Sequence, residues 1–155
     1  MQIRFTALPT HDVLKVQQGG SDAYGQQPDR FTSNGNGVPC RHCMKMVAEG
    51  EDYLALAWRP FTQLQPYAET GPIFLHAESC ERAAETELLP EIIDSPNYIL
   101  RGYSADERII YGTGKVTPRE EIHDYARELF SNDAVAFIHI RSASNNCFHC
   151  RIDRA

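Results

Sequence analysis

The sequence predicts a single α+β domain, in which a mostly antiparallel or mixed β-sheet is covered by one well-defined helix. Three observations support this prediction. The chain has 155 residues, a length typical of one domain. Apolar segments of strand length recur along it, most of them joined by links short enough for hairpins. One segment, about residues 118–130, shows the apolar spacing of an amphipathic helix. Strands combined with a segregated helix are typical of the α+β class.

The first part of the chain predicts little regular structure. Residues 2–8 alternate apolar and polar side chains and predict a strand, and residues 11–16 predict one short helical turn. Residues 17–39 hold five glycines and two prolines and predict a long flexible loop. Loops of this length in compact domains are either functional flaps or disordered segments. The sequence leaves both alternatives open.

The middle of the chain predicts two strands. Residues 52–61 carry apolar side chains on both faces, which is typical of a central strand, and Pro60 ends it. Residues 72–77 predict the next strand. The acidic segment 79–94 predicts short helical turns and a solvated face.

Residues 97–103 and 107–113 predict a hairpin, because only three residues separate two apolar runs. The helix follows, with Thr117 as the predicted N-cap, Pro118 at its first position and Glu120 completing a capping box. Its apolar stripe predicts packing on the sheet and comprises Ile122, Tyr125, Ala126 and Leu129. Residues 134–143 and 147–153 predict the last two strands.

Composition and charge exclude several classes of function. The formal net charge is −6, and no basic stripe is present that could follow a nucleic-acid backbone. An acidic surface also disfavours anionic membranes, and no segment has the apolar length of a membrane span or signal peptide. We therefore expect a cytoplasmic protein. Five cysteines, an odd number, favour thiols or metal ligands over a disulfide framework.

The stretch from Tyr53 to Cys80, with two cysteines just upstream, concentrates the candidate site residues. Cys40-x-x-Cys43 supplies two thiolates, and His76-x-x-x-Cys80 supplies an imidazole and a third thiolate. Three cysteines and one histidine match the chemistry of a zinc site. Arg59, Tyr67 and Glu69 lie in the same stretch and complete the candidate list: Cys40, Cys43, Arg59, Tyr67, Glu69, His76 and Cys80.

Two other uses of the cysteines compete with this site. Cys147-x-x-Cys150 could complete a four-cysteine zinc site with the first pair, but an extended strand points these two side chains to opposite faces. Cys40-x-x-Cys43 also resembles a thiol–disulfide exchange motif, which needs a helix N-terminus that the surrounding residues do not clearly provide.

An enzyme acting on a small anionic substrate is the alternative function. Arg59 and Arg101 both lie on predicted strands among apolar neighbours, so each needs a carboxylate partner such as Glu69 or an anionic ligand. In this alternative the two arginines hold the substrate and His76 is the acid or base. No motif identifies a reaction, so the sequence does not decide between an enzyme and a protein of binding or accessory type.

Several phrases of the sequence resemble one known family. They are CRHC, GEDYLALAWRPF, PYAETGPIFLHAESC, the YILRGY and RIIYGTG pair, and the closing AFIHIRSASNNCFHCRIDR. Together they resemble the bacterial domain of unknown function 1203 family (DUF1203), over nearly the whole chain from about Cys40 onward. The resemblance implies a small stand-alone bacterial protein. It implies no activity and no functional residues, because the family has no assigned function.

Overall fold

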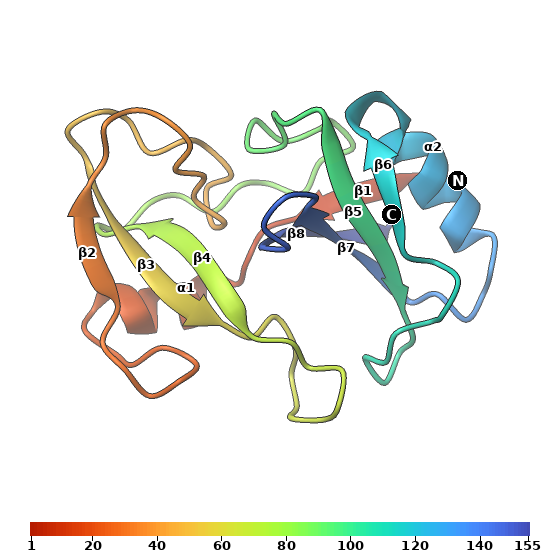
Figure 1. Ribbon diagram of the computed structural model, residues 1–155, viewed down its shortest axis with the longest axis horizontal. Helices are drawn as coiled ribbons and strands as arrows, with labels where there is room; N and C mark the ends of the chain where they lie inside the picture. Colours follow the sequence, from red (N-terminus) through yellow and green to blue (C-terminus); the bar gives the residue numbers. More distant parts are fainter.

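The computed structural model describes all residues from Met1 to Ala155 and confirms the α+β class. Its strands form two antiparallel sheets at the two ends of the molecule (Figure 1), rather than the one sheet that the sequence predicted. The five-stranded sheet has the order β1 (Ile3–Thr6), β8 (Phe148–Arg154), β7 (Phe137–Ser142), β5 (Asn97–Tyr103) and β6 (Lys115–Pro118). The three-stranded sheet has the order β2 (Asp29–Thr32), β3 (Asp52–Trp58) and β4 (Gly71–His76).

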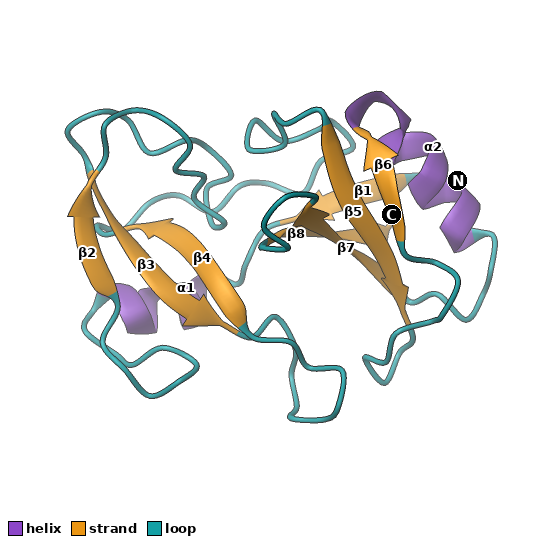
Figure 2. Cartoon of the chain, viewed as in Figure 1, coloured by secondary structure: helices purple, strands orange, loops and turns teal.

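Three helical segments accompany the sheets (Figure 2): α1 (Thr10–Gln17), the short 3-10 helix η1 (Arg119–Glu121) and α2 (Ile122–Phe130). No helix has both the length and the apolar character needed to cross a membrane. The helix α2 lies at the five-stranded end of the molecule, and α1 lies beside the three-stranded sheet. Each sheet therefore has one helix nearby.

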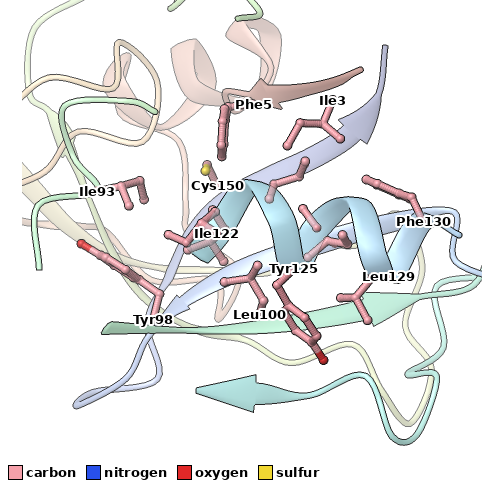
Figure 3. Close-up of a cluster of buried hydrophobic side chains, with 14 of the residues drawn as sticks. Ile3, Phe5, Ile93, Tyr98, Leu100, Ile122, Tyr125, Leu129, Phe130 and Cys150 are labelled. Carbon is pink, nitrogen blue, oxygen red and sulfur yellow. The ribbon is translucent and has the colours of Figure 1, made fainter. Parts of the chain in front are cut away.

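The core of the five-stranded sheet is a cluster of 18 buried residues, which we call the large cluster. The predicted stripe of α2 lies in it, with Ile122 and Ala126 fully buried, and packs over strand residues such as Leu100 (Figure 3). Cys150 on β8 belongs to the same cluster and lies near Phe5 in Figure 3. The sequence prediction of an amphipathic helix on a sheet is confirmed.

The core of the three-stranded sheet is a separate, smaller cluster of 12 buried residues, which we call the small cluster. Leu54 and Leu56 of β3 lie beside Leu75 and Ile73 of β4 in the antiparallel register. Helix α1 contributes Val13 and Val16. Strand β3 pairs with both neighbours, so its prediction as a central strand is correct.

Arg41 joins the two halves of the molecule. Its guanidinium is buried and donates from Nε to the carbonyl of Phe148 on β8, at 2.8 Å, and from Nη1 to the carbonyl of Pro39, at 2.7 Å. Burying a charged group without hydrogen bonds is costly, so these carbonyl partners offset part of that cost. Arg41 therefore ties the segment before the cysteine motif to the five-stranded sheet.

The prediction of a loop over residues 17–39 missed one strand. Residues 29–32 form β2, which pairs with β3 from Asp29 opposite Ala55 to Thr32 opposite Asp52. All four residues of β2 are exposed, because it is an edge strand that covers no core. It therefore lacks the apolar alternation that identifies a half-buried strand in a sequence.

The partner of β5 was also predicted wrongly. Residues 107–113 form turns with one isolated antiparallel bridge, Ile109 opposite Tyr103, rather than a strand, and the strand that pairs with β5 on this side is β6. Glu107 has a φ of 63°. Its backbone N–H donates to the carbonyl of Ser104, and the backbone N–H of Arg108 donates to the hydroxyl of Ser104. This tight turn replaces the start of the predicted strand. The hydroxyl of Thr113 accepts a hydrogen bond from the backbone N–H of Gly102, at 3.0 Å.

The predicted capping box at Thr117 is wrong as well. Thr117 is fully buried within β6, and its hydroxyl donates to the carbonyl of Lys115. Pro118 has the extended ψ of 144°, so α2 begins only at Ile122, after η1. Pairing with β5 outweighed the local capping preference at this position.

The acidic segment 79–94 contains no helix, contrary to the prediction of helical turns. Its backbone pairs with distant segments: Phe5 donates to the carbonyl of Thr86, and Ala83 donates to the carbonyl of His42. These long-range hydrogen bonds take the place of helical ones. The segment is therefore an irregular connection between the two halves.

Candidate metal centre

Cys40 and Cys43 lie on a tight turn that precedes β3. The backbone N–H of Met44 donates to the carbonyl of Cys40 at 2.9 Å, and the N–H of Cys40 donates to the carbonyl of Lys45 at 3.0 Å. Met44 has a φ of 55°, the left-handed conformation that lets the chain reverse here. Cys40 also forms a bridge with Phe74 of β4. The turn is thus fixed against the strand that carries the next ligand.

His76 and Cys80 come from the end of β4 and the bend after it. His76 is the last residue of β4 and lies opposite Tyr53 in the sheet register. The N–H of Ala77 still bonds to the carbonyl of Asp52, after which the chain bends and leaves the sheet. The bend brings Cys80 back beside Cys40, with 3.9 Å between the two sulfurs.

The four ligand atoms lie within 4.8 Å of one another and form a compact potential metal-binding site. In a tetrahedral zinc site, sulfurs lie about 3.8 Å apart, and a sulfur and a nitrogen lie about 3.6 Å apart. The distance from Cys40 Sγ to Cys80 Sγ is 3.9 Å, and that from Cys43 Sγ to His76 Nδ1 is 3.4 Å. Both distances match these values. The cluster is consistent with zinc bound by Cys40, Cys43, His76 and Cys80.

The pKa shifts of the three thiols favour one thiolate in the cluster and disfavour a second and a third. Hydrogen bonds from the thiols of Cys43 and Cys80, with backbone N–H groups, hold the pKa of Cys40 far below its ordinary value. The neighbouring Cys40 thiolate in turn raises the pKa of Cys43 to about 11. Cys40, and then Cys43, raise the pKa of Cys80 far above its ordinary value. Three thiolates in this space therefore need a cation among them.

Glu51 and a backbone amide support the ligands. The Nε2 atom of His76 lies 3.1 Å from the carboxylate of Glu51, which leaves Nδ1 directed at Cys43 Sγ. A histidine ligand in proteins usually donates its second ring N–H to a carboxylate in this way, which fixes its tautomer and orientation. The backbone N–H of His76 also donates to Cys40 Sγ at 3.3 Å.

His42, between the two cysteines of the motif, supports Cys80. Its ring is buried, with Nδ1 3.2 Å from Cys80 Sγ and Nε2 2.9 Å from the hydroxyl of Thr10. Burial is the main cause that lowers the pKa of His42, so its ring is neutral. A consistent assignment has the Thr10 hydroxyl donating to Nε2 and Nδ1–H donating to the sulfur. This N–H···S bond would stabilise a Cys80 thiolate.

The structure places the other cysteines away from this cluster. Cys150 is buried in the large cluster, and burial raises its pKa to about 12. Cys147 lies at the β7–β8 turn, where its thiol bonds to the carbonyl of Asn145. Cys40 and Cys43 belong to a turn and not to a helix N-terminus, which is where exchange motifs acquire their reactive thiolate. The four-cysteine site and the exchange motif therefore lack the geometry that each requires.

The remaining candidates do not join the cluster. Glu69 accepts from Arg101 Nη2 at 2.8 Å and also from Arg141, on β5 and β7 of the five-stranded sheet. Tyr67 packs edge-on against Tyr111 in the same region. Arg59 lines a separate cavity of about 810 Å³, which neither Arg101 nor His76 lines. The three residues of the anionic-substrate alternative thus lie in three different environments, and nothing in their arrangement supports an enzyme.

Sequence reasoning grouped the four residues that form this potential metal-binding site, but it did not predict their contacts with three other residues: Thr10, His42 and Glu51. The position of His42 inside the cysteine motif was the one available signal. Thr10 and Glu51 are distant from their partners in the sequence and carry no pattern. Only the fold brings them to the site.

One comparison with known proteins identifies a family. The family described as "Protein of unknown function (DUF1203)" matches residues 37–154 of the 155-residue chain. Neither a curated protein nor a solved structure matches the chain. The matched region contains all four ligands of the cluster and both sheets apart from β1 and β2. The chain therefore belongs to the DUF1203 family, as its phrases suggested.

Proposed function

We propose that Cys40, Cys43, His76 and Cys80 bind one structural zinc ion, and that the protein is a zinc-stabilised module of binding or accessory type. One observation carries this proposal: four soft or borderline ligand atoms from two separate segments converge within 4.8 Å, and the Cys40–Cys80 and Cys43–His76 distances match those of a tetrahedral zinc site. Thiolate and imidazole ligands favour zinc over magnesium or calcium, which prefer oxygen.

The ligand count favours a structural role for the metal. Catalytic zinc sites usually have three protein ligands and keep one position for water or substrate, whereas structural sites have four protein ligands. Here three cysteines and one histidine fill all four positions. Cys40 is fully buried, and Cys43 and Cys80 pack against the small cluster. The ion would therefore fasten the turn at residues 40–43 to β4 and the bend after it.

Thiolate ligands also bear on where the protein functions. All five cysteines are free, and free thiols persist in reducing compartments. On this basis we propose that the protein functions in the cytoplasm. The net charge of −6 speaks against nucleic acid and anionic membranes as partners.

Elemental analysis of the purified, untagged protein tests the proposal. We expect about one zinc per chain in the wild type and none in the double variant Cys40→Ser/Cys43→Ser. Cys147→Ser is the matched control, because Cys147 is half-buried like Cys43 but lies outside the cluster. This control should retain the full zinc content.

Two results would contradict the proposal. One is a wild-type protein that stays metal-free after refolding in zinc and extensive dialysis. The other is a double variant that keeps the zinc content of the wild type, which would place the metal on other residues.

A further inference from the structure

The cavity that Arg59 lines lies between the two halves of the molecule, away from the cysteine cluster. It has a volume of about 810 Å³, within the range of small-molecule sites. One side is built from α1 and the end of β3, through residues such as Lys15 and Trp58. The other side is built from β7 and β8, through His139 and Phe148. None of the four metal ligands lines it.

Lys15 and Arg59 differ from the other two cations of this cavity, because Arg82 donates to the carbonyls of Leu8 and Ala7 and Arg151 pairs with Asp153. Neither Lys15 nor Arg59 takes part in an ion pair. The Nε atom of Arg59 is buried and has no hydrogen-bond partner. A guanidinium among apolar groups needs an acceptor, and Arg101 has one in Glu69 whereas Arg59 has none. A bound anion would supply an acceptor that the protein itself does not provide.

Two of the three acidic side chains of the cavity accept hydrogen bonds from other groups of the protein. Asp22 accepts the backbone N–H groups of Tyr24, Gln26 and Ala57, and hydrogen bonds of this kind lower its pKa. Glu107 accepts from the backbone N–H and the hydroxyl of Thr62. Asp12 is exposed in the first turn of α1, where the helix dipole favours a negative charge. None of the three carboxylates forms an ion pair with Lys15 or Arg59.

His139 is a second polar group of the cavity without a protein partner. It is only 1% exposed, and its Nδ1 atom is buried with no hydrogen bond. The ring packs among aromatic rings, with centroids 5.1 Å from Phe61 and 4.8 Å from Phe148. Burial, with Arg141, Arg151 and Arg101 nearby, keeps the pKa of His139 well below its ordinary value. The ring is therefore neutral, with one N–H to donate and one nitrogen to accept.

The cavity thus combines aromatic and polar groups. Trp58, Phe61 and Phe148 give it apolar surface, while Lys15 and Arg59 give it positive charge. Pockets that bind small organic molecules typically pair apolar walls with a few converging polar groups. A guanidinium and an ammonium select carboxylate, phosphate or sulfonate groups.

We propose that this cavity binds a small organic anion, whose acidic group pairs with Arg59 and Lys15 and whose apolar body lies against Trp58 and Phe148. The site is distinct from the zinc centre and does not depend on the metal proposal. His139 lines the cavity with a neutral ring that is almost fully buried. The binding step involves no covalent chemistry.

The test uses two fluorescent probes of similar apolar shape on the full chain. One is the aromatic anion 8-anilinonaphthalene-1-sulfonate, and the other is the uncharged N-phenyl-1-naphthylamine. We expect the wild type to bind one molecule of the anionic probe, with inorganic phosphate competing. Removing the charge in Arg59→Gln should lower the affinity for the anionic probe by about tenfold or more, because hydrogen bonds to charged groups are stronger than those between neutral groups. The uncharged probe should bind this variant as it binds the wild type.

Two further variants keep the test decisive. Lys15→Gln changes an exposed residue, so the variant should fold normally. It should bind the anionic probe more weakly and the uncharged probe as the wild type does. Arg30→Gln is the control, because Arg30 pairs with Asp52 and Glu78 on the three-stranded sheet and does not line the cavity. Equal loss of both probes in Arg59→Gln, unchanged binding of the anionic probe in both cavity variants, or binding of many probe molecules per chain would each overturn the proposal.

Discussion

Around the five-stranded sheet, 18 buried residues form one cluster and α2 packs its full apolar stripe into it. Around the three-stranded sheet the cluster has 12 residues, and two of its strands have only four and six residues. Small sheets need several strands and a substantial apolar face, or another element, for stability. The cysteine cluster lies beside the small cluster only. We therefore expect apolar burial to stabilise the half with the five-stranded sheet. We expect apolar burial together with a metal ion to stabilise the half with the three-stranded sheet.

The largest expected effect comes from comparing two buried cysteines, one in each half. Cys40→Ser should abolish zinc binding and lower the free energy of unfolding by about 4 kcal/mol, the stabilisation that a ligand gives at 1,000 times its Kd. Cys150→Ser should keep one zinc and cost about 1–3 kcal/mol, because it buries a hydroxyl among apolar residues. Urea unfolding with zinc analysis measures both. Equal zinc content in the two variants would remove the distinction between the halves.

Removing a large side chain from the large cluster tests the other half. Phe130 is fully buried at the end of α2, so Phe130→Ala should cost about 3–5 kcal/mol of stability. The folded fraction should still carry one zinc per chain. Leu88→Ala is the control, because Leu88 is 77% exposed and should change stability by less than about 0.5 kcal/mol. Loss of zinc from folded Phe130→Ala would show that the two halves are not independent.

The pH dependence of zinc affinity tests the ionisation of the three thiols at the metal centre. Without metal, the raised pKa values of Cys43 and Cys80 keep both thiols protonated near neutral pH, whereas the lowered pKa of Cys40 keeps it ionised. Zinc must then displace these two thiol protons, so affinity should rise about 100-fold per pH unit above about pH 7, where an ordinary histidine is neutral. Competition titrations with a chelating dye measure this slope. A slope of zero would contradict these ionisation states.

Glu51 provides the smallest of these effects. Glu51→Gln should lower zinc affinity by about 10–100-fold, as is typical when the carboxylate partner of a histidine ligand is removed. One zinc should still bind at saturation, because all four ligands remain. Glu49→Gln is the matched control two residues away, and it should bind zinc as the wild type does. An unchanged affinity in Glu51→Gln would show that its contact with His76 does not support the metal.

The sequence predicted most of the fold where local patterns and the final structure agree. The strands near Ile3, Leu54, Ile73 and Ile138 and the stripe of α2 follow from apolar periodicity alone. The errors lie where long-range pairing outweighed a local signal. Thr117 has the sequence of a helix cap but is held in β6 by β5, and Phe31 lies on an exposed edge strand with no periodic pattern.

The candidate site shows the same division between local and long-range information. Residue chemistry and spacing predicted Cys40, Cys43, His76 and Cys80, because metal ligands come from a narrow set of residue types. The grouping with Arg59, Tyr67 and Glu69 was predicted from nearness in sequence. The fold instead places Glu69 with Arg101 and Arg141, and Arg59 at the cavity between the halves. Nearness in sequence says little about side chains on the loop between β3 and β4, because this loop extends from the three-stranded sheet to contact the five-stranded one.

X-ray absorption at the zinc edge is the most direct test of the metal centre. We expect a first shell of three sulfurs at about 2.3 Å and one nitrogen at about 2.0 Å, the bond lengths of thiolate and imidazole ligands. The nitrogen contribution should carry the scattering pattern of an imidazole ring and disappear in His76→Ala. A shell of four sulfurs, or one made mostly of oxygen, would contradict the proposed set of ligands.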